Sequence, residues 1–271
     1  MSIQWPLVIF SLLAGCGGVG IASIGISEAL GIAKKSRVPA AIVCLVFLIV
    51  GGCASVFHLG QPSNIMAAAT NIFSFSGISV ELIMLGINVV IAAIYLFLVN
   101  RESKAAKPLS LVGILTGIVL AFVVGNGYVM ESQPNWNTIV LPLAYLGSGL
   151  GCGTALFASV MAVKKEEEAD FKAFAPFAIG AAALQLISFL AYGAVLGFAC
   201  DAVLYWLGAI VVGSAVTLVA ALLISKKNVW AYAAFACALI GGLSIRALMW
   251  LVGTGFLTLF EEAAAHNILG F

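Results

Sequence analysis

Two side chains that could exchange protons lie near the ends of long apolar stretches in this chain of 271 residues. His58 follows the apolar run that ends in SVF, and Glu81 lies near the start of the next run, in SGISVELIML. An imidazole titrates close to neutral pH, and a carboxylate in apolar surroundings can act as a general base. Together they are typical of a site that takes protons from a bound molecule.

Other kinds of chemistry find little support. The six cysteines fall mostly within apolar runs, and no two are spaced as C-x-x-C, whereas metal sites need clustered thiolates or imidazoles. GCGGVG at 15–20 matches a dinucleotide-binding pattern but lies inside an apolar run with no strand before it. His266, the second histidine, lies in the C-terminal tail, which argues against a haem held between two histidines of membrane helices. We therefore expect the chain to bind no cofactor of its own.

The composition is that of an integral membrane protein. Hydrophobic residues make up 63% of the chain and charged residues 8%, whereas about a quarter of a soluble domain is charged. The net charge of +1 gives no reason to expect a nucleic-acid partner. The N-terminal stretch MSIQWPLVIFSLLAG has no basic residue and runs on beyond the apolar core of about 7–15 residues of a signal peptide. It predicts an uncleaved first transmembrane helix.

Eight apolar runs are long enough to cross a bilayer, which takes about 20 residues per helix. They lie at 5–33, 39–58, 76–99, 108–129, 137–163, 174–197, 202–224 and 229–253. The sequence therefore predicts an all-α integral membrane protein with eight transmembrane helices in a single domain, 1–271. Similar glycine clusters in the first and fifth runs hint at two fused four-helix bundles, 1–130 and 131–271.

Basic residues lie in alternate connections, which indicates the orientation. Eleven of the 12 follow the first, third, fifth or seventh run: Lys34, Lys35, Arg37, Arg101, Lys104, Lys107, Lys164, Lys165, Lys172, Lys226 and Lys227. Because cytoplasmic loops carry the excess of basic residues, both termini are predicted to lie outside the cytoplasm. The connection 59–75 is then the longest on the outer side, and a short surface helix is expected to start near Pro62.

His58 and Glu81 are predicted to share the outer layer of the membrane. Glu81 lies about 7 Å into its helix at 1.5 Å per residue, and His58 ends the helix before it. Arg246, the remaining basic residue, lies in the outer third of the last span and is expected to pair with Glu81 or Asp201 or to receive an anionic group. Charged residues within a membrane usually mark function. A histidine bonded to a carbonyl and an acid stabilised by the helix dipole are the structural alternatives.

The sequence carries the short motifs WPLVIF at 5–10, FHLGQP at 57–62, SVE at 79–81 and PNW at 134–136. They resemble motifs of the membrane anchor subunits of DMSO reductase-type molybdoenzymes. FHLGQP resembles the H-L-G-x-P that closes the second helix of that family, and SVE resembles the Ser-x-Glu that enters its third helix. WPLVIF and PNW resemble the motifs at the start of its first helix and before its fifth, and Arg246 resembles an arginine of its last helix.

The resemblance implies a function and a set of partners. It implicates His58 and Glu81 in binding and oxidising menaquinol, the substrate, with Arg246 and Gln61 in supporting positions. It also implies an iron–sulfur subunit with four ferredoxin-like clusters and a molybdopterin catalytic subunit. Both would sit on the outer face of the cytoplasmic (inner) membrane of a prokaryote.

Two other functions remain open. A secondary transporter places its substrate near mid-membrane between broken helices, whereas the candidate residues here lie near one face. A purely structural anchor without a quinol site would leave the acid at position 81 unexplained.

Overall fold

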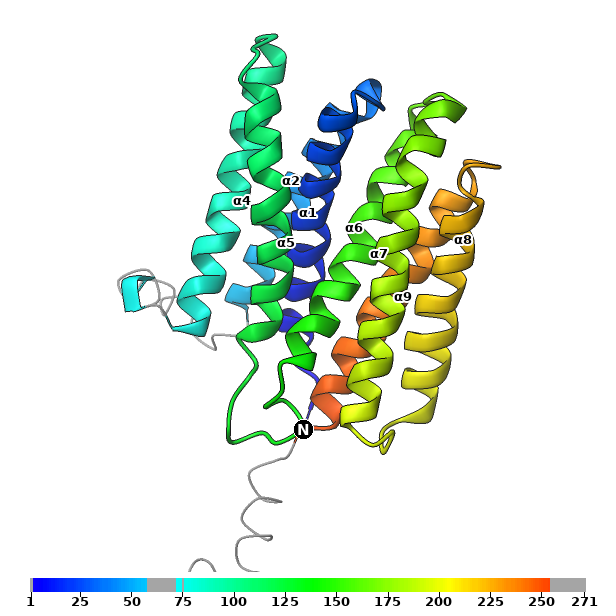
Figure 1. The fold of residues 1–271 in the computed structure, drawn as a ribbon. Helices are drawn as coiled ribbons and strands as arrows, with labels where there is room; N and C mark the ends of the chain where they lie inside the picture. The colour runs from blue at the N-terminus through cyan, green and yellow to red at the C-terminus, as the bar shows by residue number, and fades with distance from the viewer. Residues whose placement is uncertain (1, 58–71, 75, 254–271) are drawn as a thin grey trace, which may run out of the picture.

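The computed structural model describes residues 2–57, 72–74 and 76–253, and all the regular elements in this part of the chain are helices. Eight of its helices are long and apolar enough to cross a membrane (Figure 1). They are α1 (Trp5–Leu30), α2 (Lys34–Val56), α4 (Gly77–Asn100), α5 (Ala106–Asn126), α6 (Val140–Val163), α7 (Glu168–Val195), η2 with α8 (Val203–Val216 and Thr217–Leu223), and α9 (Trp230–Leu251). A short 3-10 turn, η1 (Ile72–Ser74), precedes α4. The eight predicted spans are thus confirmed.

The helices differ from the predicted spans mainly at their basic ends. α2 begins at Lys34 rather than at residue 39, and α7 begins at Glu168 rather than at residue 174. The apolar run is shorter than each helix because the first turns carry charged side chains. Their long stems reach the water layer while the backbone stays helical. The surface helix expected near Pro62 lies outside the described residues.

α1 and α6 form the centre of the molecule and are its most buried spans. Their glycines allow the backbones to come close. A Cβ atom at Gly149 would lie 3.2 Å from the carbonyl oxygen of Gly15, and a Cβ atom at Gly117 of α5 would overlap the carbonyl oxygen of Gly18. Small residues at helix crossings are the usual means of close packing in lipid. The glycine clusters therefore explain why these two helices are central.

The helices form two groups that meet along α1 and α6. α1 packs most extensively against α5 and α2, while α6 packs most extensively against α7 and α1, and η2 packs against α9. Figure 1 shows α1, α2, α4 and α5 on one side and α6, α7, α8 and α9 on the other. This agrees with two fused four-helix bundles. A common origin of the two halves stays a prediction.

One span departs from regular α-helical hydrogen bonding. Residues Val203–Val216 follow the wider π pattern before the chain continues as α8. The amide nitrogen of Gln185 donates to the carbonyl oxygen of Gly213 at 2.9 Å, and a side chain that inserts into the ladder is a recognised cause of such distortion. Gly213 also lies against the backbone of Gly241.

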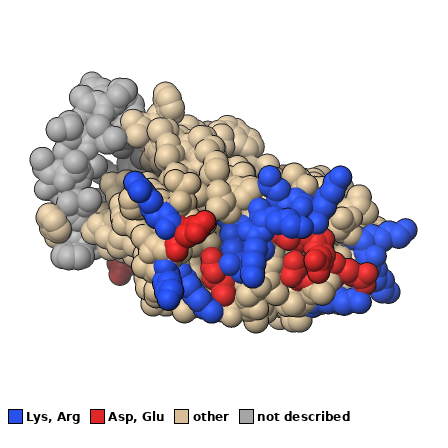
Figure 2. Space-filling model, turned by 90° about the horizontal axis from the view of Figure 1, so that it is seen from above, with Lys and Arg blue, Asp and Glu red and all other residues tan. Residues whose placement is uncertain are grey.

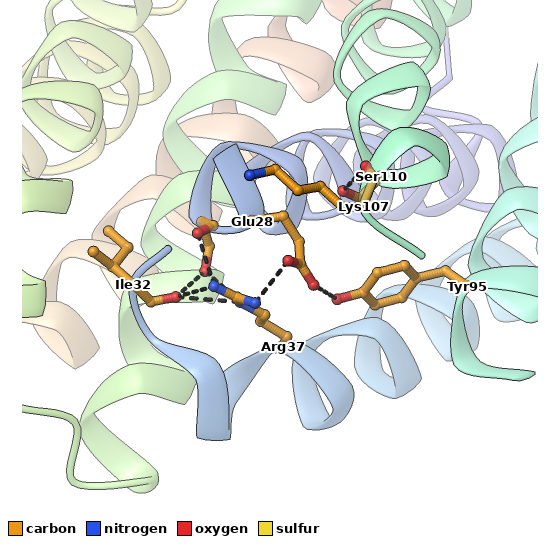
Figure 3. Close-up of polar contacts among 7 residues, drawn as sticks. Glu28, Ile32, Arg37, Tyr95, Lys107 and Ser110 are labelled. Atoms are coloured by element: carbon orange, nitrogen blue, oxygen red, sulfur yellow. Dashed lines mark hydrogen bonds and ion pairs between the residues drawn. The ribbon is translucent and has the colours of Figure 1, made fainter. Parts of the chain in front are cut away.

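The basic residues gather at one end of the bundle. This end is called the basic face and comprises residues 31–37, 101–107, 164–172 and 224–229. Figure 2 shows Lys and Arg mixed with Asp and Glu across it. Beneath it Arg37 forms an ion pair with Glu28 at 2.7 Å, and the Tyr95 hydroxyl donates to the same carboxylate at 2.8 Å (Figure 3). This network joins α1, α2 and α4, so Glu28 has a structural partner.

Candidate functional site

Glu81 lies near the end of the bundle opposite the basic face. The hydroxyl of Ser76 caps α4 by accepting a hydrogen bond from the backbone of Ser79 at 3.3 Å, and Glu81 follows in the second turn. Only 9% of the residue is exposed. No described residue forms an ion pair or a hydrogen bond with its carboxylate. A buried acid without a cation is rare in proteins and marks a candidate functional group.

The carboxylate of Glu81 lies against the backbone at the end of α5. A Cβ atom at Gly127 would overlap Oε1 of Glu81. At the same place a Cβ atom at Gly77 would lie 3.3 Å from the Cα atom of Gly127, so α4 and α5 approach closely. Gly127 leaves the space that the carboxylate occupies, and Gly77 lets the two helices approach there.

Tyr128, the next residue, starts an aromatic cluster that leads from Glu81 towards the second bundle. Its ring centre lies 5.6 Å from that of Tyr145, 6.4 Å from that of Trp136 and 6.0 Å from that of Trp250. The Trp136 indole is fixed by donating to the carbonyl oxygen of Met249 at 2.7 Å. The contacts of Tyr128 with the two tryptophans are edge-on, and such arrangements stabilise aromatic clusters beyond the area they bury.

The charge environment of the Tyr128 hydroxyl connects the cluster to two ionisable groups. Burial raises the pKa of Tyr128 well above its usual value, Tyr145 and Glu81 raise it further, and Arg246 opposes the increase. Burial is the main cause, and Glu81 and Arg246 act on the pKa of Tyr128 in opposite directions.

Arg246 lies on α9, fully buried between the two bundles. Nε donates to the hydroxyl of Ser11 at 2.9 Å, and Nη2 donates to the carbonyl oxygen of the same residue at 3.2 Å. Nη1 donates to the hydroxyl of Ser148 at 2.7 Å and to the carbonyl oxygen of Gly242 at 3.0 Å. Neutral oxygens from α1, α6 and α9 thus surround the guanidinium, whose carbon also lies 4.4 Å from the centre of the Tyr145 ring.

Two of the three alternatives for Arg246, pairing with Glu81 and pairing with Asp201, are wrong, whereas binding of an anionic group stays a prediction. Among the residues that the structure describes, neither Glu81 nor Asp201 lies within ion-pair distance of the guanidinium. Asp201 instead accepts a hydrogen bond from the backbone of Leu204 at 2.8 Å and so caps the next helix. A cation is tolerated in this position because several hydrogen bonds and an aromatic face replace its water.

Two buried donors of the same layer have no partner among the described residues. They are the hydroxyl of Tyr145 and the indole nitrogen of Trp250. Most buried polar groups are hydrogen-bonded, so such exceptions call for an explanation. Both groups belong to the aromatic cluster between Glu81 and Arg246, and both are suited to donate to an oxygen atom.

His58 and Gln61 lie outside the described residues. The helix that precedes them, α2, ends at Val56. The predicted proximity of His58 to Glu81 therefore stays a prediction. Sequence reasoning missed Gly127, Tyr128 and Tyr145. A possible signal was the position of Tyr128 at the end of a span, where aromatic residues are enriched.

Comparison with known protein families decides the family. A model of the DMSO reductase anchor subunit family (DmsC) matches residues 1–252. The chain belongs to this family. A search among curated proteins gives no match.

Membership of the anchor family applies to all eight spans, since the match ends after α9. Glu81, Tyr128, Tyr145 and Arg246 all lie within the matched region. The protein is accordingly a multi-pass membrane anchor subunit of the DMSO reductase type. No group of three His, Cys, Asp or Glu residues that could hold a metal ion occurs among residues 2–57, 72–74 and 76–253. The expectation that the chain binds no cofactor of its own stays a prediction.

Proposed function

We propose that this anchor subunit oxidises menaquinol at the end of the bundle opposite the basic face. One observation carries the proposal: a buried carboxyl group, Glu81, lies in a membrane span and has no cation beside it among the described residues. The aromatic cluster beside it offers apolar, flat surfaces suited to a ring. The hydroxyl of Tyr145, which has no hydrogen-bond partner among the described residues, offers a donor.

The chemistry requires an acceptor for protons and one for electrons. Oxidation of a quinol to a quinone releases two protons and two electrons. In this proposal Glu81 accepts one proton, His58 accepts the other, and Gln61 contributes to the same site. A base placed within hydrogen-bond reach of the group it deprotonates contributes typically about 10²–10⁴-fold to the rate.

The electrons leave through other subunits. We infer an iron–sulfur subunit that receives them and a molybdopterin catalytic subunit that passes them to the terminal acceptor. The segment 127–139 would contribute to the docking surface. It is tied to the second bundle because Asn135 donates to the carbonyl oxygen of Val252 at 2.8 Å, and the Tyr192 hydroxyl donates to the carbonyl oxygen of Asn135 at 3.2 Å.

The orientation follows from the basic face. Because cytoplasmic loops carry the excess of Lys and Arg, the basic face would lie in the cytoplasm of a prokaryote and Glu81 near the outer surface. Both termini, the quinol site and the partner subunits would then be on the outer side of the inner membrane.

Arg246 acts in this proposal through the residues it holds. Its guanidinium lies on the ring of Tyr145, whose ring in turn contacts Tyr128 beside Glu81. Arg246 would therefore position the wall of the site rather than exchange protons with the quinol.

Glu81→Gln tests the proposal. The amide keeps the size of the side chain but cannot accept the proton, so we expect menaquinol-driven turnover of the complex to fall at least tenfold. Reduction driven by a soluble dye, which bypasses the quinol, should stay at the wild-type rate. Glu102→Gln, an exposed acid on the basic face and away from both the site and the docking segment, is the control and should change neither activity.

Two results would refute the proposal. Unchanged turnover with quinol would make Glu81 a structural residue and favour a purely structural anchor. Movement of a solute into liposomes by the chain on its own would favour a secondary transporter.

A further inference from the structure

A second candidate site lies on the basic face, far along the bundle from Glu81. A cavity of about 440 Å³ opens between the turn that joins α6 to α7 and the turn that joins α8 to α9. Its apolar floor comes from Phe171 and Ile224, which are 3% and 2% exposed. The charged residues that line it are Glu166, Glu168, Lys226 and Lys227.

The two lysines that line the cavity are not paired with its acids. Glu168 is already engaged by Lys172, at 2.7 Å, and Glu166 accepts a hydrogen bond from a serine hydroxyl in the first turn of α2 at 2.8 Å. Neither Lys226 nor Lys227 forms an ion pair with any residue that the structure describes. The two ammonium groups therefore remain available for an anion.

The start of α9 adds to this charge. The helix begins at Trp230, beside the cavity, with no acidic residue in its first turn and no side chain capping it. The N-terminal end of a helix carries a partial positive charge that favours anions. The start of α7, by contrast, has Glu168 and Asp170 in its first turn. The uncompensated charge of the cavity thus lies on the side of α9.

The same edge of the cavity adjoins lipid-facing surface. Val229 lines the cavity and is 56% exposed, and Leu222 and Tyr232 on the neighbouring turns are 51% and 43% exposed. Aromatic residues such as Tyr232 and Trp230 are enriched at the level of lipid head groups. A molecule held here would have its charged end over the lysines and apolar surface directly below.

We propose that this cavity binds the phosphate of an anionic glycerophospholipid, whose acyl chains lie along the exposed sides of α8 and α9. Basic pockets between transmembrane helices on the side rich in Lys and Arg recognise anionic head groups in this way. The lysines bind the phosphate oxygens, and the apolar floor excludes water beneath them. The site is separate from the quinol site and independent of the function proposed for it.

The test is lipid binding to the full-length chain, purified with any subunits that accompany it and stripped of lipid. Native mass spectrometry measures the fraction that carries added phosphatidylglycerol. We expect the double variant Lys226→Gln/Lys227→Gln to bind at least fivefold less than wild type. The double variant Lys226→Arg/Lys227→Arg, which keeps both charges, should bind as wild type does.

Lys34→Gln/Lys35→Gln is the matched control, because these adjacent lysines also lie on the basic face but do not line the cavity. It should bind phosphatidylglycerol as wild type does. An equal loss of binding in this control would overturn the proposal, since charge alone would then explain it. Unchanged binding in Lys226→Gln/Lys227→Gln would also overturn it.

Two competitors define the ligand. Phosphatidylcholine, which has no net charge, should be retained at least fivefold less than phosphatidylglycerol, and equal retention would overturn the preference for an anionic lipid. Inorganic phosphate at millimolar concentration should displace little of the bound phosphatidylglycerol. Complete displacement would show that the cavity takes free phosphate and would refute the assignment to a lipid.

Discussion

The carboxylate of Glu81 lies against the backbone of Gly127, at the residue where α5 ends, and no side chain separates the two. Gly127 has a φ of −61°, which any residue can adopt. Glycine is therefore required at this position by the space that the carboxylate takes and not by the backbone conformation. The contact joins two helices of the first bundle at the proposed quinol site.

Gly127→Ala should displace the carboxylate while leaving both helices intact. A displacement of about 1 Å can cost an active site about 10²-fold in rate, so we expect menaquinol-driven turnover to fall at least tenfold. Gly86→Ala on α4 is the control, because a Cβ atom there would meet no other atom within 4 Å. Equal turnover of the two variants would show that the position of the carboxylate does not matter.

Tyr128→Phe removes the hydroxyl of Tyr128 but keeps the ring, so it tests the role of the hydroxyl alone. The ring contacts with Tyr145, Trp136 and Trp250 would remain, so assembly and dye-driven activity should be unchanged. Loss of a polar group near Glu81 should lower menaquinol-driven turnover severalfold. Tyr205→Phe removes a hydroxyl that donates to the carbonyl oxygen of Phe189 within the second bundle, and its turnover should stay at the wild-type level. A similar decrease in both variants would point to a general effect on structure.

Ser148→Ala should destabilise the interface between the bundles. The substitution removes one acceptor of Arg246 and leaves a buried N–H of a charged group unpaired, which costs about 1–3 kcal/mol. Ser23→Ala is the control, because the hydroxyl of Ser23 only bonds the carbonyl oxygen of Val19 on its own helix. Denaturant unfolding in mixed micelles measures the stability of both variants. Equal midpoints for the two variants would contradict a bridging role of Arg246.

Quinol oxidation by the reconstituted complex should generate no membrane potential. Glu81 lies one to two turns from the end of α4 opposite the basic face, and the proposed partners dock at that end. Protons and electrons would then leave the quinol on the same side. A potential-sensitive dye in proteoliposomes reports the outcome, and a signal that a protonophore abolishes would place the site or the partner on the other side.

The sequence alone determined the number of spans, the face that carries the basic residues and the candidate role of Glu81. These features are local, because a run of about 20 apolar residues forms a spanning helix whatever its neighbours are. For the same reason Glu81 could be identified as a buried acid from the apolar run around it. The family resemblance rested on short motifs in the same way and was confirmed over residues 1–252.

Only the tertiary structure decided what the buried groups contact. Pairing with an acid was one of the alternatives for Arg246, yet it bonds Ser11 and Ser148, which are 235 and 98 residues away along the chain. No local pattern encodes such contacts, because they depend on which faces of α1, α6 and α9 meet. Close packing at glycines sets those faces. The contact between Glu81 and Gly127 arises in the same way, where two helices approach closely enough for a carboxylate to rest on a backbone.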